Sequence, residues 1–115
     1  MVLWIGFDLQ AEIEAGDDYN WTALHFAACE GKDAVAAQLL QAGASVSAVD
    51  YNSSTPLHYA AWYGISSIAN MLLQANASLT AVDNDGRTPA QDAKHQSHGD
   101  LAAMLLEAEQ AAALK

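Results

Sequence analysis

The stretch STPLHYAAWYG, Ser54 to Gly64, predicts a short helix with both of its ends marked. Thr55 is a good N-cap, because its hydroxyl can accept a hydrogen bond from a free backbone amide. Pro56 suits the first helical position, where no amide donor is needed. Gly64 can adopt the left-handed conformation that ends a helix, and the paired alanines in between allow another helix to approach closely. The stretch therefore indicates a helix that packs against other helices.

The same pattern occurs 33 residues earlier in the chain. DYNWTALHFAACEG, Asp18 to Gly31, aligns with YNSSTPLHYAAWYG, Tyr51 to Gly64, at a constant offset of 33. At this spacing Leu39 and Leu40 fall on Leu72 and Leu73. An aspartate and a threonine each recur three times, as Asp17, Asp50 and Asp83 and as Thr22, Thr55 and Thr88. A period that holds at so many positions indicates a repeat protein.

Each unit also predicts a second helix after the first. We expect Asp33 in one unit and Ser66 in the next to cap this helix at its start. Apolar residues then recur on one helical face. Gly43 ends the helix in the first unit, and Asn76 takes the same place in the second, because asparagine tolerates the left-handed conformation. An extended stretch and a turn complete the unit.

These features resemble the ankyrin repeat. The resemblance rests on Thr22-Ala23-Leu24-His25 and Thr55-Pro56-Leu57-His58, on Gly31 and Gly64, on the Leu-Leu pairs and on Gly43-Ala44. It covers about Asp17 to Leu106 and is specific, because a 33-residue period with a TPLH-like signature is typical of this family. It implies an all-α fold, an ankyrin-repeat solenoid of stacked helix-turn-helix units with projecting β-turn fingers.

The repeats indicate a single domain, residues 1–115, made of four parts. We expect a degenerate N-terminal half-repeat that acts as a cap, two full repeats, and a third repeat with the C-terminal cap, at residues 1–16, 17–49, 50–82 and 83–115. Lys94 marks the end of the array, because its counterparts Ala28 and Ala61 must be small where a further helix packs.

Apolar side chains mark the expected core. Phe26 and Tyr59 precede the paired alanines, so we expect them to pack between helices. In the last unit we expect an inward face made by Leu101, Met104, Leu105 and Leu106. The alanine-rich tail that follows predicts an extension of the last helix.

The composition restricts the classes of function. A hydrophobic fraction of 52% is enough for a core, and the net charge of −10 repels phosphate, which argues against nucleic acid and favours basic partners. The one cysteine, Cys29, fits a reducing compartment, so we expect the cytoplasm, with the nucleus as an alternative. No apolar run of about 18 residues occurs, so we expect no membrane span. The acidic surface also argues against a membrane partner.

Three arrangements of reactive residues occur, and we expect no catalytic, metal or cofactor site from them. His25 and His58 occupy equivalent positions, where the resemblance implies hydrogen bonds to threonine and backbone. His95 and His98 lie three residues apart, but structural zinc sites show tighter Cys/His motifs. Cys29 lies one helical turn after His25, yet no oxyanion donor is suggested. We therefore expect a protein that is not an enzyme.

The resemblance implies that partners meet the concave face, made by the turn tips and the exposed side of each first helix. Carried over position by position, it gives a set of partner-binding residues: Asp18, Tyr19, Trp21, Glu30, Tyr51, Asn52, Ser54, Trp62, Tyr63, Asp85, Arg87 and His95. Tyrosine and tryptophan are enriched in binding hot spots. We expect a monomeric protein–protein interaction module whose aromatic and acidic face binds a basic or amphipathic segment of another protein.

Three alternatives stay open. Trp62 and Tyr63 could pack on a neighbouring turn instead of binding a partner. The aromatic residues could form a homo-oligomer interface in a structural element. The second repeat is also similar to ankyrin domains of plant organelle-targeting factors, which implies recognition of lipid head groups, although an acidic surface disfavours anionic lipid.

Overall fold

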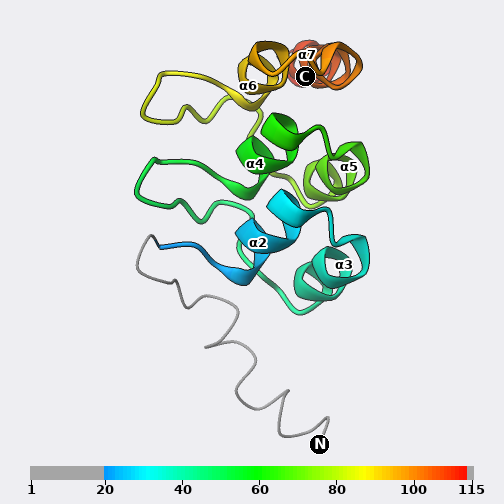
Figure 1. Cartoon of the computed structure of the whole chain (residues 1–115). Helices are drawn as coiled ribbons and strands as arrows, with labels where there is room; N and C mark the ends of the chain where they lie inside the picture. Colours follow the sequence, from blue (N-terminus) through cyan, green and yellow to red (C-terminus); the bar gives the residue numbers. More distant parts are fainter. Residues whose placement is uncertain (1–19, 114–115) are drawn as a thin grey trace, which may run out of the picture.

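A computed structural model of the chain describes residues 20–113, which fold into helices and contain no strand. The helices are α2 (Ala23–Glu30), α3 (Asp33–Gln41), α4 (Pro56–Tyr63), α5 (Ser66–Gln74), α6 (Pro89–His95) and α7 (Gly99–Ala113). Helices α2, α4 and α6 stack in an inner row and α3, α5 and α7 in an outer row, while the loops before α4 and α6 project from the inner row (Figure 1). The all-α ankyrin solenoid is the fold that the sequence predicts. The predicted cap at residues 1–16 lies outside the described residues.

The inner helices begin and end as their sequences predict. Each starts at a threonine N-cap with extended backbone, and the side chain of the third helical residue returns to the amide of that threonine. The C-caps Gly31 and Gly64 have φ of 69° and 73°, in the left-handed region. These capping signals therefore fix the length of α2 and α4.

The outer helices begin differently from the prediction. Lys32 and Ile65 are the N-caps, and Asp33 and Ser66 are already the first helical residues of α3 and α5. The expected side-chain capping is wrong, because the linkers after α2 and α4 are only two residues long and are held by backbone bonds such as Ile65 N to the carbonyl of Ala60. The carboxylate of Asp33 instead bonds across the stack to the neighbouring outer helix.

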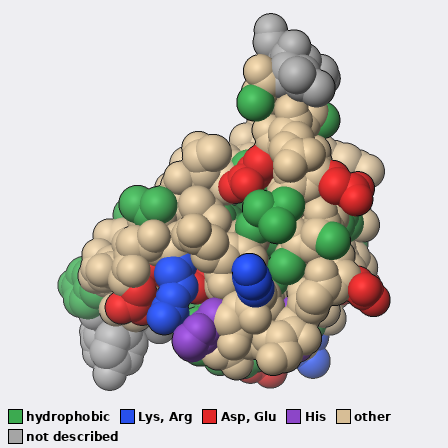
Figure 2. All heavy atoms as spheres, turned by 90° about the horizontal axis from the view of Figure 1, so that it is seen from above, with side chains coloured by type: hydrophobic (Ala, Val, Ile, Leu, Met, Phe, Trp, Pro, Cys, Tyr) green, Lys and Arg blue, Asp and Glu red, His purple; other side chains and the backbone are tan. Residues whose placement is uncertain are grey.

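The core runs continuously between the two rows of helices. Leu57, Ile68, Leu72 and Leu105 are fully buried within it. Small alanines let the inner helices approach one another, and the fully buried set includes Ala28, Ala61 and Ala93. Lys94 is exposed, as expected at the end of the stack. Figure 2 looks onto this end, where charged side chains lie among hydrophobic ones.

Two residues that were expected in the core are exposed. Phe26 is 47% exposed, and its ring packs edge-to-face with Trp21, with centroids 4.7 Å apart, instead of between helices. Leu106 is 44% exposed, because one residue along a helix turns the side chain away from the buried Leu105. Tyr59, by contrast, is partly buried and packs against the core, as predicted.

Candidate binding pocket on the concave face

The candidate site lies between two finger loops, residues 50–54 and 83–87. Each finger is a β-turn held by an aspartate at its first position. The Oδ1 atoms of Asp50 and Asp83 accept hydrogen bonds of 2.9–3.0 Å from the backbone amides two and four residues later. In both described fingers the recurring aspartate therefore holds the turn through backbone amides. The third of these aspartates, Asp17, lies outside the described residues.

Two buried histidines tie each inner helix to the following finger. In His25 and His58, Nδ1 lies 3.0 Å from the amide nitrogen of the capping threonine and accepts a hydrogen bond from it. Nε2 therefore carries the ring proton and donates to a carbonyl oxygen 3.0 Å away, in Ser54 and Arg87 respectively. The structural role that the resemblance implies is confirmed, and His25 is not poised to activate Cys29.

Trp21 fills the junction between the first two repeats. Its indole Nε1 donates to Asp50 Oδ2 at 2.8 Å and lies 3.2 Å from the hydroxyl of Tyr59. The Tyr59 hydroxyl also donates to Asp50, and the two rings meet edge-on with centroids 4.8 Å apart. The first junction, meaning Trp21, His25 and Phe26 against Asp50 and Tyr59, is thus closed by aromatic side chains.

The charge of Asp50 is stabilised within this junction. Burial raises the pKa of Asp50, but hydrogen bonds from the Tyr59 hydroxyl, two backbone amides and the Trp21 indole outweigh it. The pKa of Asp50 is therefore below its ordinary value, and the carboxylate stays ionised at neutral pH. Burial, together with the bond to Asp50, raises the pKa of Tyr59 to about 12.

The second junction has the same framework with smaller side chains. Ser54 stands 33 residues after Trp21, and Asp92 stands 33 residues after Tyr59. These exchanges leave a pocket of about 240 Å³ between the fingers, α4 and α6. The second junction, meaning Ser54, His58 and Tyr59 against Asp83 and Asp92, is therefore open where the first is filled.

Asp92 forms the buried floor of this pocket. Its side chain is 2% exposed, and Oδ1 has no hydrogen-bond partner among the described residues. Burial raises the pKa of Asp92 to about 7, with a further contribution from the hydrogen bond to Asp83 and from its charge. Asp83 and Asp85 also line the pocket, and Arg87 lies 3.8 Å from the carboxylate of Asp85. The pocket is thus acidic, and one buried acceptor is left for a donor from outside.

The same residues are a poor metal site. His58, Asp83 and Asp92 can bring one ligand atom each within 4.8 Å of one another. However, both ring nitrogens of His58 already bond to the protein backbone. A metal would have to break the bond that holds the finger to α4, so the geometry favours a hydrogen-bond donor over a metal ion.

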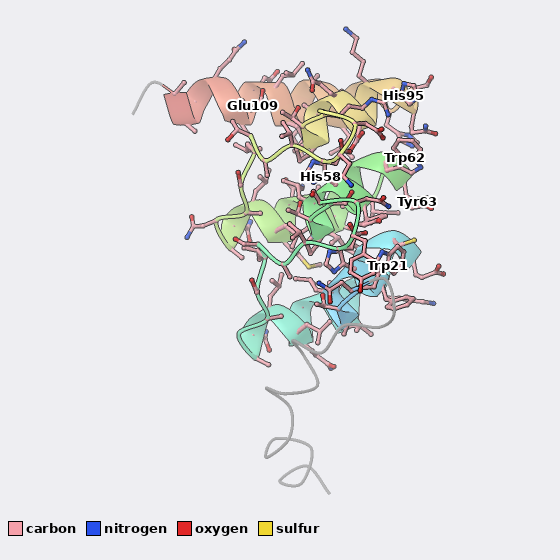
Figure 3. All side chains as sticks on the ribbon, turned by 90° about the vertical axis from the view of Figure 1, so that its left-hand side faces the viewer. Trp21, His58, Trp62, Tyr63, His95 and Glu109 are labelled. Carbon is pink, nitrogen blue, oxygen red and sulfur yellow. The ribbon has the colours of Figure 1, made fainter. Side chains whose placement is uncertain are left out.

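Trp62 and Tyr63 form one wall of the pocket, and Figure 3 shows Tyr63, Trp62 and His95 one after another up the stack. The rings of Trp62 and His95 lie 5.8 Å apart, with their planes tilted by 34°. Tyr63 is 49% exposed and bonds to the thiol of Cys29. Burial, the larger effect, raises the pKa of Cys29. The aromatic pair therefore contacts the flanking inner helices and leaves part of its surface open.

The structure brings some of the expected partner-binding residues together and separates others. Five of them line the pocket: Asn52, Ser54, Trp62, Tyr63 and Asp85. Glu30, Tyr51 and His95 are exposed outside it, Arg87 is partly buried beside it, and Trp21 is partly buried in the first junction. Asp18 and Tyr19 lie outside the described residues.

Sequence reasoning did not include the acidic floor of the pocket. Asp83 and Asp92 line it, and neither was predicted to meet a partner. A signal was present, because Asp92 is an acid at the position that is aromatic in both earlier repeats, Phe26 and Tyr59. A charge at a position that is otherwise aromatic marks a local departure from the repeat.

The chain belongs to the ankyrin repeat family. The family described as ankyrin repeats (3 copies) matches residues 3–83, which is more than half of the sequence. Proteins of this family generally act as protein–protein interaction modules and are typically not enzymes. A search of curated proteins finds no significant match. Within residues 20–113, no helix combines the length and apolar character that crossing a membrane requires.

Proposed function

We propose that the protein binds a basic segment of a partner protein on its concave face, over the pocket of the second junction. The observation that carries this proposal is the pocket itself, where aspartates on the floor and one finger face the aromatic wall of Trp62 and Tyr63. Aromatic side chains offer contact area at little entropic cost, and acidic groups select a partner of opposite charge.

The charge of the whole chain supports the same class of partner. The net charge is −10, so a basic segment is attracted over a distance of about 10 Å at moderate ionic strength. The described finger loops add exposed polar groups on both sides of the pocket, including Asn52 and Asn84. A short extended segment laid across the fingers would contact both asparagines and the aromatic wall.

The proposal is tested by selecting binders from a randomised peptide library displayed on phage. We expect the selected peptides to be enriched in lysine and arginine. We further expect the double variant Trp62→Ala, Tyr63→Ala to bind them at least about tenfold more weakly, because each truncation at a hot spot typically costs more than about 1 kcal/mol.

A matched control separates the concave face from the rest of the surface. The variant Val35→Ala changes an exposed apolar residue on α3, in the outer row, and should leave peptide affinity unchanged. Selected peptides without basic enrichment, or equal binding by wild type and the double variant, would overturn the proposal. Circular dichroism of each variant checks that the helices remain.

A further inference from the structure

The first difference between the two junctions is an indole hydrogen-bond donor that is present in the first junction and missing from the second. In the first, the Trp21 indole lies between the fingers and donates to the carboxylate of Asp50. In the second, the equivalent residue is Ser54, and the equivalent carboxylate is Asp83. The Oδ1 atom of Asp83 is taken by the backbone of its own finger, as in Asp50. The indole that reaches the other oxygen of Asp50 thus has no counterpart in the side chain at position 54.

The second exchange removes another donor and adds an acceptor. In the first junction the Tyr59 hydroxyl donates to Asp50. In the second junction the equivalent position holds Asp92, whose Oδ1 is buried and has no partner among residues 20–113. A buried carboxylate oxygen without a donor is unfavourable, because it has lost its hydrogen bonds to water without replacing them. The second junction is therefore short of donors and rich in acceptors.

We propose that the pocket of the second junction receives one cationic side chain of a partner, a lysine or an arginine, whose N–H groups bond to Asp92 and Asp83. The incoming side chain would occupy the volume that Trp21 fills in the first junction, and its aliphatic part would lie against Tyr59 and Trp62. This inference rests on the proposed function and names the group that the partner inserts.

A cation fits this pocket better than a neutral donor. Asp83, Asp85 and Asp92 all line the pocket, and Arg87 lies to one side at 3.8 Å from Asp85. Asp83 and Asp92 can bring one oxygen each within 4.8 Å of one another. Covering these two acidic groups without a counter-charge is costly, and a cationic donor meets both the charge and the hydrogen-bond deficit. The aromatic faces of Trp62 and Tyr59 also favour a cation, which is attracted by the ring quadrupole.

The test uses small cations that mimic the two side chains. Wild-type protein labelled with ¹⁵N is titrated with n-butylammonium, which mimics lysine, and with n-propylguanidinium, which mimics arginine, at constant ionic strength. Tetramethylammonium, a cation without N–H donors, is the control for simple screening. We expect saturable shifts of the Asn84 and Asp85 amides and of the Trp62 indole with one or both donor cations. The stronger binder identifies the side chain.

Two variants locate the binding. Asp92→Asn keeps the shape of the floor and removes its charge, so donor-cation affinity should fall about tenfold. Asp100→Asn makes the same change of charge at an exposed residue of α7 and should change affinity less than about twofold. Ser54→Trp places in the second junction the residue that closes the first, and it should abolish binding without lowering the melting temperature.

The outcomes separate this inference from the proposed function. The inference is wrong if neither donor cation saturates, if tetramethylammonium shifts the same resonances equally, or if Ser54→Trp binds the cations as tightly as wild type. Peptides selected on the concave face that bind wild type and Asp92→Asn equally would leave the proposed function standing and overturn only the inference. Cation binding without selection of any basic peptide would overturn the proposed function and leave only a cation-binding pocket without a partner peptide.

Discussion

The Nε2 atom of His58 lies 3.0 Å from the carbonyl oxygen of Arg87, so one buried imidazole connects α4 to the finger of the next repeat. On its other side, Nδ1 accepts a hydrogen bond from the amide of Thr55. Burial, the largest effect, lowers the pKa of His58, so the ring stays neutral with its proton on Nε2. This bridge holds the finger that carries Asp83 against α4, where it lines the pocket.

We predict that His58→Ala lowers the free energy of unfolding by about 2–3 kcal/mol, because it leaves the Thr55 amide and the Arg87 carbonyl unbonded. Urea denaturation followed by circular dichroism measures the change. His95→Ala is the matched control, since His95 is exposed, and it should change stability by less than about 0.5 kcal/mol. Equal effects of the two substitutions would show that the bridge to Arg87 is not stabilising.

A second prediction compares two glycines that share one backbone conformation. Gly64 has φ +73° and Gly86 has φ +74°, so alanine is strained by about 1–2 kcal/mol at either position. A Cβ at Gly64 would also lie 2.8 Å from the ring of His98, whereas a Cβ at Gly86 meets nothing within 4 Å. The His98 ring cannot retreat freely, because its Nε2 bonds to the Trp62 carbonyl.

Gly64→Ala should therefore destabilise the protein by about 1–3 kcal/mol more than Gly86→Ala does. Thermal and urea unfolding of the two variants, measured side by side, give the difference directly. If both variants lose the same stability, the close approach of α4 to the α6–α7 turn is not as the structure describes it.

The indole of Trp21 gives a third prediction. Trp21→Phe keeps an aromatic ring but removes the donor to Asp50, and a hydrogen bond to a charged group is worth about 1.5–3 kcal/mol. Trp62→Phe is the control, because the Trp62 indole makes no hydrogen bond to the described part of the chain, and it should cost less than about 1 kcal/mol. Urea denaturation at pH 7 compares them, and a larger loss in Trp62→Phe would contradict the prediction.

The pH dependence of stability provides a fourth prediction, from Asp92. Its pKa is about 7 in the folded chain and near 4 when unfolded, so the folded state binds more protons between these values. The contribution of Asp92 to stability therefore falls as the pH rises through this window. Asp92→Asn removes that dependence, so its melting temperature should match wild type near pH 5 and exceed it at pH 8.

The control for this prediction is Asp100→Asn, which removes a charge from an exposed acid of α7, and its difference from wild type should change less between pH 5 and pH 8 than that of Asp92→Asn. The difference between each variant and wild type is the quantity to compare, because Asp50, whose pKa is lowered, acts in the opposite direction. A constant difference between Asp92→Asn and wild type from pH 5 to pH 8 would mean that Asp92 is not protonated in the folded chain.

The sequence predicts the fold because the repeated residues determine where the inner helices begin and end and how they stack. The capping threonines and the glycines at Gly31 and Gly64 fix the inner helices, and the 33-residue period fixes how they stack. The outer helices were less predictable at their starts, because backbone bonds within a two-residue linker replace the side-chain caps expected at Asp33 and Ser66.

The pocket is harder to predict, because it arises where two positions lack the large aromatic side chains of the first junction. The sequence offers Trp62 and Tyr63 as an obvious aromatic pair, and both line the pocket. Its depth comes from Ser54 and Asp92, which are ordinary surface residue types in isolation. They become informative only when the repeats are aligned, because each then stands where the first junction has a large aromatic ring.

The footprint of a bound peptide tests the central claim most directly. A basic peptide selected on the wild-type protein is titrated into the ¹⁵N-labelled chain, and backbone amide shifts are recorded. We predict that the shifts concentrate at Asn52, Trp62, Tyr63 and Asn84, on the concave face around the pocket. Shifts that concentrate on the outer helices α3 and α5, with these four amides unmoved, would contradict the account.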